Sequence, residues 1–214
     1  MTKKERAKKI VEALENEYPL AECTLDYENA WQLVVSVRLA AQCTDARVNI
    51  VTQVLFDKYP SAKALAAAEV ADIEEIVRPC GLGASKARDI SKAMKMLVGE
   101  YGGVVPDDLD ELLKIPGVGR KSANLIVGDV YGKPAVVCDT HCIRLCGRFG
   151  LTDGTTNPAS VEKQLRAILP MDKANDFCHR LVLHGRAVCM ARGYICDKCC
   201  LTMLCKSAFV RKTK

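Results

Sequence analysis

Apolar residues recur at the spacing of α-helices along almost the whole chain, and this periodicity restricts the possible folds more than any other feature. Ala7, Ile10, Val11 and Leu14, for example, occupy positions i, i+3, i+4 and i+7, with Thr2 as a plausible N-cap. No stretch alternates apolar and polar residues as a half-buried β-strand does. The sequence therefore predicts an all-α fold. The predicted helices cover residues 2–17, 31–42, 45–58, 62–68, 70–78, 85–100, 107–114, 120–131, 140–149, 158–169 and 173–188.

The segment over residues 31–42 is apolar on nearly every side, as expected of a helix buried at the centre of a helical domain. Its nearly uncharged run, Trp31 to Val37, is far too short to span a bilayer, and the lysine-rich start of the chain differs from a signal peptide. With 49% hydrophobic and 27% charged residues, the composition excludes disordered and fibrous proteins. We expect a soluble, cytoplasmic protein and take it to be a monomer.

The charge of the chain is concentrated at its C-terminal end. The net charge is +5, and the segment from Cys189 onward carries six basic residues against Asp197, so the preceding part is neutral. A basic segment on a neutral body suggests a polyanionic partner, although a tail that only improves solubility explains the charge equally well.

Two glycines separated by one residue mark a turn between two predicted helices, in the segment Ile115–Pro116–Gly117–Val118–Gly119. Gly117 and Gly119 allow a tight turn with exposed N–H groups, and the next helix begins at once with the positive end of its dipole. This arrangement suits an anion, and it would hold a DNA phosphate without reading base sequence. An ordinary turn between helices is the alternative. The apolar residues on both sides favour a helix-hairpin-helix element, because both arms can then pack together.

Four of the twelve cysteines form a second pattern. Cys189, Cys196, Cys199 and Cys205 are separated by six, two and five residues. Four thiolates are the usual ligand set of a [4Fe–4S] cluster or of a structural zinc ion, and common zinc sites use two short pairs whereas this segment has one. The spacing therefore favours iron and sulfur over zinc, and Cys199 over its neighbour Cys200. The other cysteines, at positions 23, 43, 80, 138, 142, 146 and 178, are expected to be small buried apolar residues.

Taken together and in this order, these motifs resemble the endonuclease III family of DNA repair glycosylases with lyase activity. The family also has counterparts of Leu39–Ala40–Ala41–Gln42–Cys43–Thr44–Asp45, of Cys138–Asp139–Thr140–His141 and of Leu183–His184–Gly185–Arg186. The resemblance runs nearly end to end. It implies a two-lobed helix-hairpin-helix glycosylase fold, with a six-helix domain over residues 23–133 and an iron–sulfur domain formed by residues 1–22 and 134–214. Double-stranded DNA would lie in the groove between them.

The resemblance also implies the catalytic residues. Lys121 corresponds to the family's nucleophile and Asp139 to its catalytic partner. A damaged base, expected to be an oxidised pyrimidine, would be flipped out of the duplex, and Lys121 would attack C1′ to form a Schiff base that permits β-elimination. A phosphate-contacting lysine and a helix N-cap are the alternatives for these two residues.

Further residues are expected to contact DNA containing damaged bases or abasic sites in the nucleoid. Gln42 and Leu82 would fill the gap that the flipped base leaves, although Gln42 could instead cap a helix and Leu82 could anchor a turn. Cationic or polar side chains near the motifs would contact DNA, mostly at its phosphates. These are Arg120, His141, Arg144, Arg148 and Arg192. A solvated surface position is the alternative for Arg144, Arg148 and Arg192, and closing the start of a helix is the alternative for His141.

Three other functions compete with this interpretation of the sequence. An adenine-mismatch glycosylase lacks the hairpin lysine, which this chain has as Lys121. Such an enzyme also needs a glutamate on the buried helix, where this chain has Ser36. A non-catalytic DNA-binding module or an iron–sulfur electron carrier would leave Lys121 and Asp139 without a role.

Overall fold

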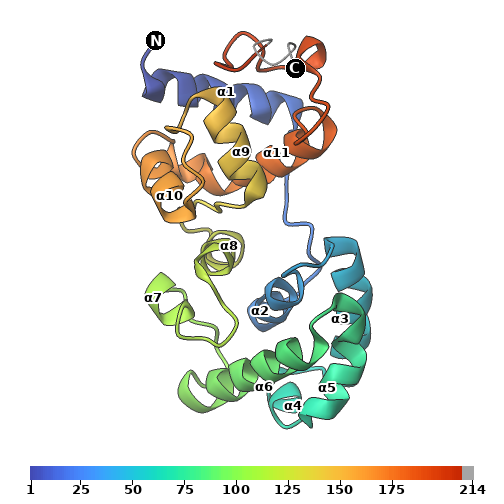
Figure 1. Ribbon diagram of the computed structural model, residues 1–214. Coiled ribbons are helices and arrows are strands. Elements are labelled where there is room, and N and C mark those ends of the chain that lie inside the picture. Colours follow the sequence, from blue (N-terminus) through green and yellow to red (C-terminus); the bar gives the residue numbers. More distant parts are fainter. Residues whose placement is uncertain (209–214) are drawn as a thin grey trace. The chain divides into compact units, whose positions relative to one another are not determined.

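The computed structural model describes residues 1–208, and every regular element among them is a helix (Figure 1). The all-α prediction is confirmed. Part of the basic C-terminal segment, with Arg211, Lys212 and Lys214, lies outside the described residues. The α-helices are α1 Lys3–Glu17, α2 Ala30–Leu39, α3 Asp45–Lys58, α4 Ala62–Ala66, α5 Val70–Val77, α6 Gly83–Glu100, α7 Leu109–Leu112, α8 Arg120–Tyr131, α9 Thr140–Phe149, α10 Pro158–Arg166 and α11 Ala174–Ala187. Short 3₁₀ segments are η1 Arg78–Cys80, η2 Met171–Lys173 and η3 Cys196–Lys198.

Side-chain caps explain where several helices begin. The Thr2 hydroxyl accepts a hydrogen bond from the Glu5 amide while the Glu5 carboxylate accepts one from the Thr2 amide, which closes a capping box at α1. Asn29, Thr44 and Ser61 accept hydrogen bonds from backbone amides in the first turns of α2, α3 and α4. These helices begin at or next to the predicted residues, because capping residues can be read from the sequence.

Some helix ends differ from the prediction. The helix expected over residues 31–42 ends at Leu39, because residues 40–43 form the turn after which Thr44 caps α3. Helix α10 ends at Arg166 rather than at residue 169, and α6 begins at Gly83, two residues earlier than expected. Apolar residues keep a helical spacing on both sides of these boundaries. The spacing therefore does not locate a turn that tertiary packing imposes.

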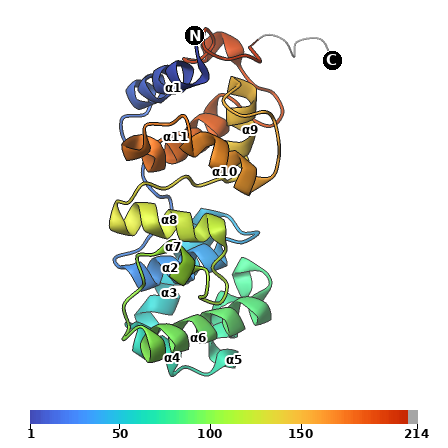
Figure 2. The same cartoon turned by 90° about the vertical axis from the view of Figure 1, so that its left-hand side faces the viewer.

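Contacts divide the chain into two compact units. The first unit is Cys23–Gly132, and within it α2 is buried on most of its sides, with Leu33 and Leu39 fully inaccessible. This helix packs against α3, α6 and α8, while α4 and α5 pack against α6 (Figure 2). Helices α4 and α7 are single turns of five and four residues. The prediction of a buried central helix is confirmed.

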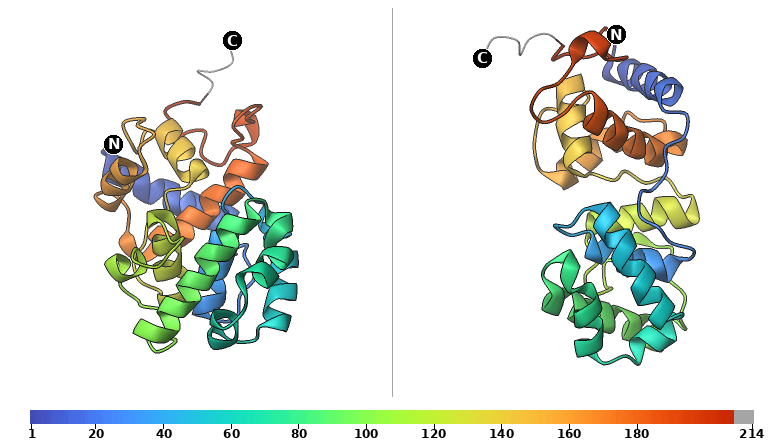
Figure 3. Two further views of the ribbon diagram at one scale, coloured as in Figure 1. Left: turned by 60° about the horizontal axis from the view of Figure 1, so that its bottom comes forward. Right: turned by 90° about the vertical axis from the view of Figure 1, so that its right-hand side faces the viewer.

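The second unit joins the N-terminal helix to the C-terminal part of the chain: it comprises Met1–Glu22 and the chain from Lys133 onward. Helices α1 and α9 both pack against α11 (Figure 3). The Arg180 guanidinium donates to the Tyr18 carbonyl at 3.0 Å and so ties α11 to the end of α1. Within the described residues, no helix has the length and apolar character that crossing a membrane would require.

Candidate functional site

The glycine-containing turn between α7 and α8 is held by its own apolar residues. Ile115 and Val118 are buried, and the Val118 amide donates to the Ile115 carbonyl at 3.0 Å. Gly117 is exposed and has a φ of 81°, a conformation that favours glycine. A Cβ atom at Gly117 would also lie 2.6 Å from Cδ of Arg38, so only glycine fits here without rearrangement. The turn thus presents its backbone while its apolar side chains anchor it.

The first turn of α8 follows this hairpin directly. Gly119 is the N-cap and no side chain caps the helix start, as far as the described residues show. Arg120 and Lys121 occupy the first two helical positions, and both side chains are exposed. The backbone amides at the start of α8 and the positive end of its dipole lie next to two cations, which is the arrangement that binds an anion at a helix N-terminus.

Asp139 is the N-cap of α9. Its Oδ1 accepts a hydrogen bond from the Cys142 amide at 2.7 Å, so the capping role considered for this residue is observed. The carboxylate is only half-buried. Asp139 belongs to the unit that contains α1 and α11, whereas Lys121 belongs to the unit Cys23–Gly132. The catalytic role of Asp139 stays a prediction.

Gln42 and Leu82 share an uncommon backbone conformation. They are the two non-glycine residues with positive φ in residues 1–208, at 56° and 53°. Gln42 lies in the turn after α2, and Leu82 directly precedes α6. Both side chains are exposed, and Leu82 retains 58% of its accessible surface. A left-handed conformation costs a residue with a Cβ about 1–2 kcal/mol, and such strain is concentrated at functional sites.

The four cysteines predicted as ligands line one pocket. Cys189, Cys196, Cys199 and Cys205 surround it together with apolar residues that include Phe149, whereas Cys200 is exposed and does not line it. Burial, followed by neighbouring thiolates, raises the pKa of the Cys199 thiol. Sulfur ligands in an apolar pocket suit a thiolate-bound metal group.

No three potential ligands among the described residues converge on one point as a single metal ion would require. The sulfur ligands of an iron–sulfur cluster bind different iron atoms, so four thiols around one pocket are a donor set that such a cluster can use.

Two arginines of α9 hold the polypeptide around this pocket. The Arg148 guanidinium donates to the carbonyls of Met190 at 2.7 Å and Ala191 at 3.1 Å, and to Sγ of Cys189 at 3.1 Å. Arg148 is only 7% exposed, so the suggestion that it contacts phosphate or is solvated is wrong. Its neighbour Arg144 donates to the Cys189 carbonyl at 3.1 Å and is half-buried. A DNA contact of Arg144 stays a prediction. Its hydrogen bond to Cys189 shows that Arg144 also helps to hold the cysteine-containing segment.

Close packing of α9 on α11 involves Gly185, which the sequence analysis named only as part of a family segment and gave no role. A Cβ atom at Gly185 would lie 2.3 Å from Nδ1 of His141 and 2.9 Å from Nη2 of Arg144. The adjacent His184 is fully buried, and its Nε2 lies 3.4 Å from Sγ of Cys199. Burial lowers the pKa of His184 to about 4, so the imidazole is neutral at pH 7. The signal in the sequence was the segment Leu183–His184–Gly185–Arg186, which resembles the family just before Cys189.

Arg192 lies in the segment between Cys189 and Cys196 and is exposed. Its backbone is anchored nearby, since Arg148 binds the preceding carbonyl of Ala191. The predicted phosphate contact is compatible with this exposure and is not tested by it.

Comparisons with known proteins agree with these features. Residues 35–171 match the sequence profile of the HhH-GPD superfamily of base excision DNA repair proteins. The chain is 44% identical to endonuclease III of Synechocystis sp., covering 97% of this chain and 94% of the relative, and 41% identical to endonuclease III of Bacillus subtilis, covering 92% and 90%. It also matches the structure of a trapped covalent endonuclease III–DNA intermediate, with a TM-score of 0.92, 38% identity and 99% coverage of both chains.

The fold and these matches define a base excision repair protein of the HhH-GPD superfamily. Within that superfamily the chain belongs to the endonuclease III family, and it is a DNA glycosylase and AP lyase.

Proposed function

We propose that this chain removes oxidised pyrimidines from duplex DNA and cleaves the resulting abasic site, with Lys121 as the nucleophile and Asp139 as its partner. The observation that carries the proposal is the placement of Lys121. Its side chain is exposed in an uncapped first helical turn, directly after a hairpin whose glycine backbone is also exposed. A DNA phosphate bound by that backbone would bring the deoxyribose close to the amine.

In the proposed reaction the Lys121 amine attacks C1′ of the flipped nucleotide. The bond between C1′ and the base breaks, and its electron pair leaves with the base. Loss of the ring-oxygen bond then gives a Schiff base, and removal of a C2′ proton expels the 3′ phosphate. Asp139 would accept and return the protons of these steps. The trapped covalent DNA complex of the 38% identical endonuclease III supports a covalent route.

Binding of the damaged duplex would combine three kinds of contact. Gly117, Gly119 and Arg120 of the hairpin would hold backbone phosphate, and His141, Arg144 and Arg192 would add contacts from the other unit. Gln42 and Leu82 would enter the gap left by the flipped base, which their exposure supports. The enzyme would act on chromosomal DNA in the cytoplasmic nucleoid as a monomer.

We further propose a [4Fe–4S] cluster held by Cys189, Cys196, Cys199 and Cys205. The shared pocket that the four thiols line supports this assignment. The cluster would supply a covalent cross-link that fixes the segment carrying Arg192. We assign residues 23–133 to the hairpin domain, which contains the seven helices α2 to α8 rather than the six expected, and residues 1–22 and 134–214 to the cluster domain. The division of contacts at Gly132 supports this assignment.

Borohydride trapping tests the nucleophile. The unmodified enzyme should form a covalent adduct with a duplex carrying an oxidised pyrimidine, and Lys121→Ala should form none. Lys92→Ala, which removes an exposed lysine of α6, should leave the adduct yield unchanged. An undiminished adduct with Lys121→Ala would refute the assignment. Failure of the unmodified enzyme to nick an abasic-site duplex would instead favour a DNA-binding module or an electron carrier.

A further inference from the structure

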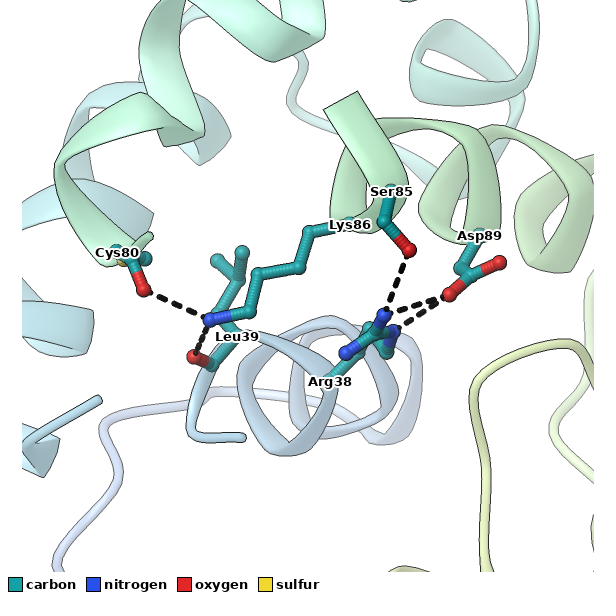
Figure 4. A network of polar contacts seen from close by, with 6 residues as sticks. All are labelled: Arg38, Leu39, Cys80, Ser85, Lys86 and Asp89. Atoms are coloured by element: carbon teal, nitrogen blue, oxygen red, sulfur yellow. Dashed lines mark hydrogen bonds and ion pairs between the residues drawn. The ribbon is translucent and has the colours of Figure 1, made fainter. Parts of the chain in front are cut away.

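Lys86 is a buried cation that the proposed reaction does not use. Its side chain is fully inaccessible, and Nζ lies 2.8 Å from the carbonyl oxygen of Leu39 and 2.8 Å from that of Cys80 (Figure 4). Both acceptors are main-chain groups, and in residues 1–208 no carboxylate pairs with this ammonium. Burial lowers the pKa of Lys86. A buried charge without a counter-charge is a poor source of stability, so this lysine calls for another explanation.

The two carbonyls belong to the segments that carry the exposed left-handed residues. Leu39 is the last residue of α2, three positions before Gln42. Cys80 is the last residue of η1, two positions before Leu82. The ammonium therefore joins the turn that bears Gln42 to the turn that bears Leu82. These are the two non-glycine residues with positive φ in the described chain.

Lys86 fixes Leu82 from both sides. Its side chain binds the Cys80 carbonyl before Leu82, and its own amide donates to the Leu82 carbonyl at 3.0 Å. On the other turn, the Leu39 carbonyl lies at the negative end of the α2 dipole, where a cation is favoured. Strained conformations persist only where the surroundings determine them strongly, and these hydrogen bonds supply that restraint at both turns.

A second polar contact between α2 and α6 provides a comparison. The Arg38 guanidinium pairs with Asp89 at 2.7 Å and donates to Ser85 at 3.4 Å (Figure 4). It reaches neither of the two turns, and its aliphatic part lies against Gly117 of the hairpin. The general alignment of α2 and α6 thus has its own ion pair. Between the two turns themselves, the Cys80 thiol interacts with the Cys43 thiol, and the Lys86 ammonium adds two hydrogen bonds that reach both turns at once.

We infer that Lys86 is a positioning residue for damage recognition: its ammonium holds the Gln42 and Leu82 turns at a fixed spacing, so that both side chains enter the gap of a flipped-out nucleotide together. The inference rests on the proposed roles of Gln42 and Leu82. Prior ordering of two contacts lowers the cost of making them both, so loss of Lys86 should weaken lesion binding and leave the chemistry of Lys121 intact.

The test uses the full-length holoenzyme and the Lys86→Met variant, which keeps an unbranched side chain one atom shorter and removes the charge. The half-saturating enzyme concentration for a duplex with one oxidised pyrimidine should rise about tenfold, while the single-turnover rate at saturation changes less than about threefold. Binding to an undamaged duplex should stay the same. Lys92→Met, the same substitution at an exposed position of α6, should match the unmodified enzyme.

A mutant cycle shows whether Lys86 acts through the two turns. In a background with Gln42→Ala and Leu82→Ala, Lys86→Met should weaken lesion binding no further. An equal tenfold loss in that background, or no loss in the unmodified one, would overturn the inference. If the background alone binds the lesion normally, the proposed roles of Gln42 and Leu82 fail instead.

Lys86→Gln, whose amide can still donate, should give an intermediate loss. Failure of both Lys86 variants to melt cooperatively would make the lysine a part of the core only and would also overturn the inference.

Discussion

The hairpin and the cysteine-containing segment are both proposed to face DNA, yet they are held in place by different means. The hairpin is anchored by the buried side chains of Ile115 and Val118 and by the close approach of Gly117 to Arg38. Between Met190 and Ala208 the only buried residue is Leu201, and four thiols face one pocket instead. The hairpin can therefore keep its shape through its own buried side chains, whereas the second segment is held by hydrogen bonds from α9 at its start and, beyond them, by what its thiols bind.

The largest effect expected from this comparison follows the loss of a ligand. Cys199→Ser should abolish iron binding and lower the melting temperature by roughly 10 °C, because a structural metal group contributes folding free energy. Iron content per chain, visible absorption and thermal melting measure these changes. Cys200→Ser is the matched control, since this neighbouring thiol does not line the pocket, and it should retain the cluster. A colourless, zinc-loaded preparation of the unmodified protein would contradict the iron–sulfur assignment.

A smaller effect is expected from one methyl group in the hairpin. Gly117→Ala should lower the free energy of unfolding by about 1–3 kcal/mol, because alanine is strained at a φ of 81° and its Cβ would lie 2.6 Å from Cδ of Arg38. Chemical denaturation measures this change, and iron content should stay the same. Gly119→Ala is the control, because its φ is −95° and a Cβ there meets nothing within 4 Å. Equal stability losses in both variants would show that the contact with Arg38 is not the cause.

The smallest effect concerns a single phosphate contact of the cysteine-containing segment. Arg192→Ala should weaken binding to all duplex sequences alike and reduce the slope of log K against log salt by about 0.9, since one released counterion is lost. Titrations of an undamaged duplex at several salt concentrations measure the slope. Lys9→Ala removes an exposed cation of α1 and should leave the slope unchanged. The same slope in Arg192→Ala and in the unmodified enzyme would remove this residue from the interface.

Some features of the site could be predicted because they depend on neighbours in the sequence. Thr2 and Asp139 cap helices through amides three residues ahead, and the hairpin glycines serve a local turn. The spacing of Cys196 and Cys199 likewise limits how their thiols can be placed. Residue type and short-range spacing are sufficient for such arrangements, since the partners are a few bonds apart.

The sequence by itself thus determined the helical class, most helix starts, the glycine-containing hairpin and the set of candidate thiols. Only the tertiary structure decided that Lys86 bridges two turns, that Arg148 is buried against the cysteine-containing segment and that Gln42 and Leu82 share a left-handed backbone. These features join residues that are distant in sequence, or depend on turns that packing imposes. Whether a lysine or an arginine is solvated or buried depends on which distant carbonyls packing brings within reach, and side-chain periodicity carries no information about those carbonyls.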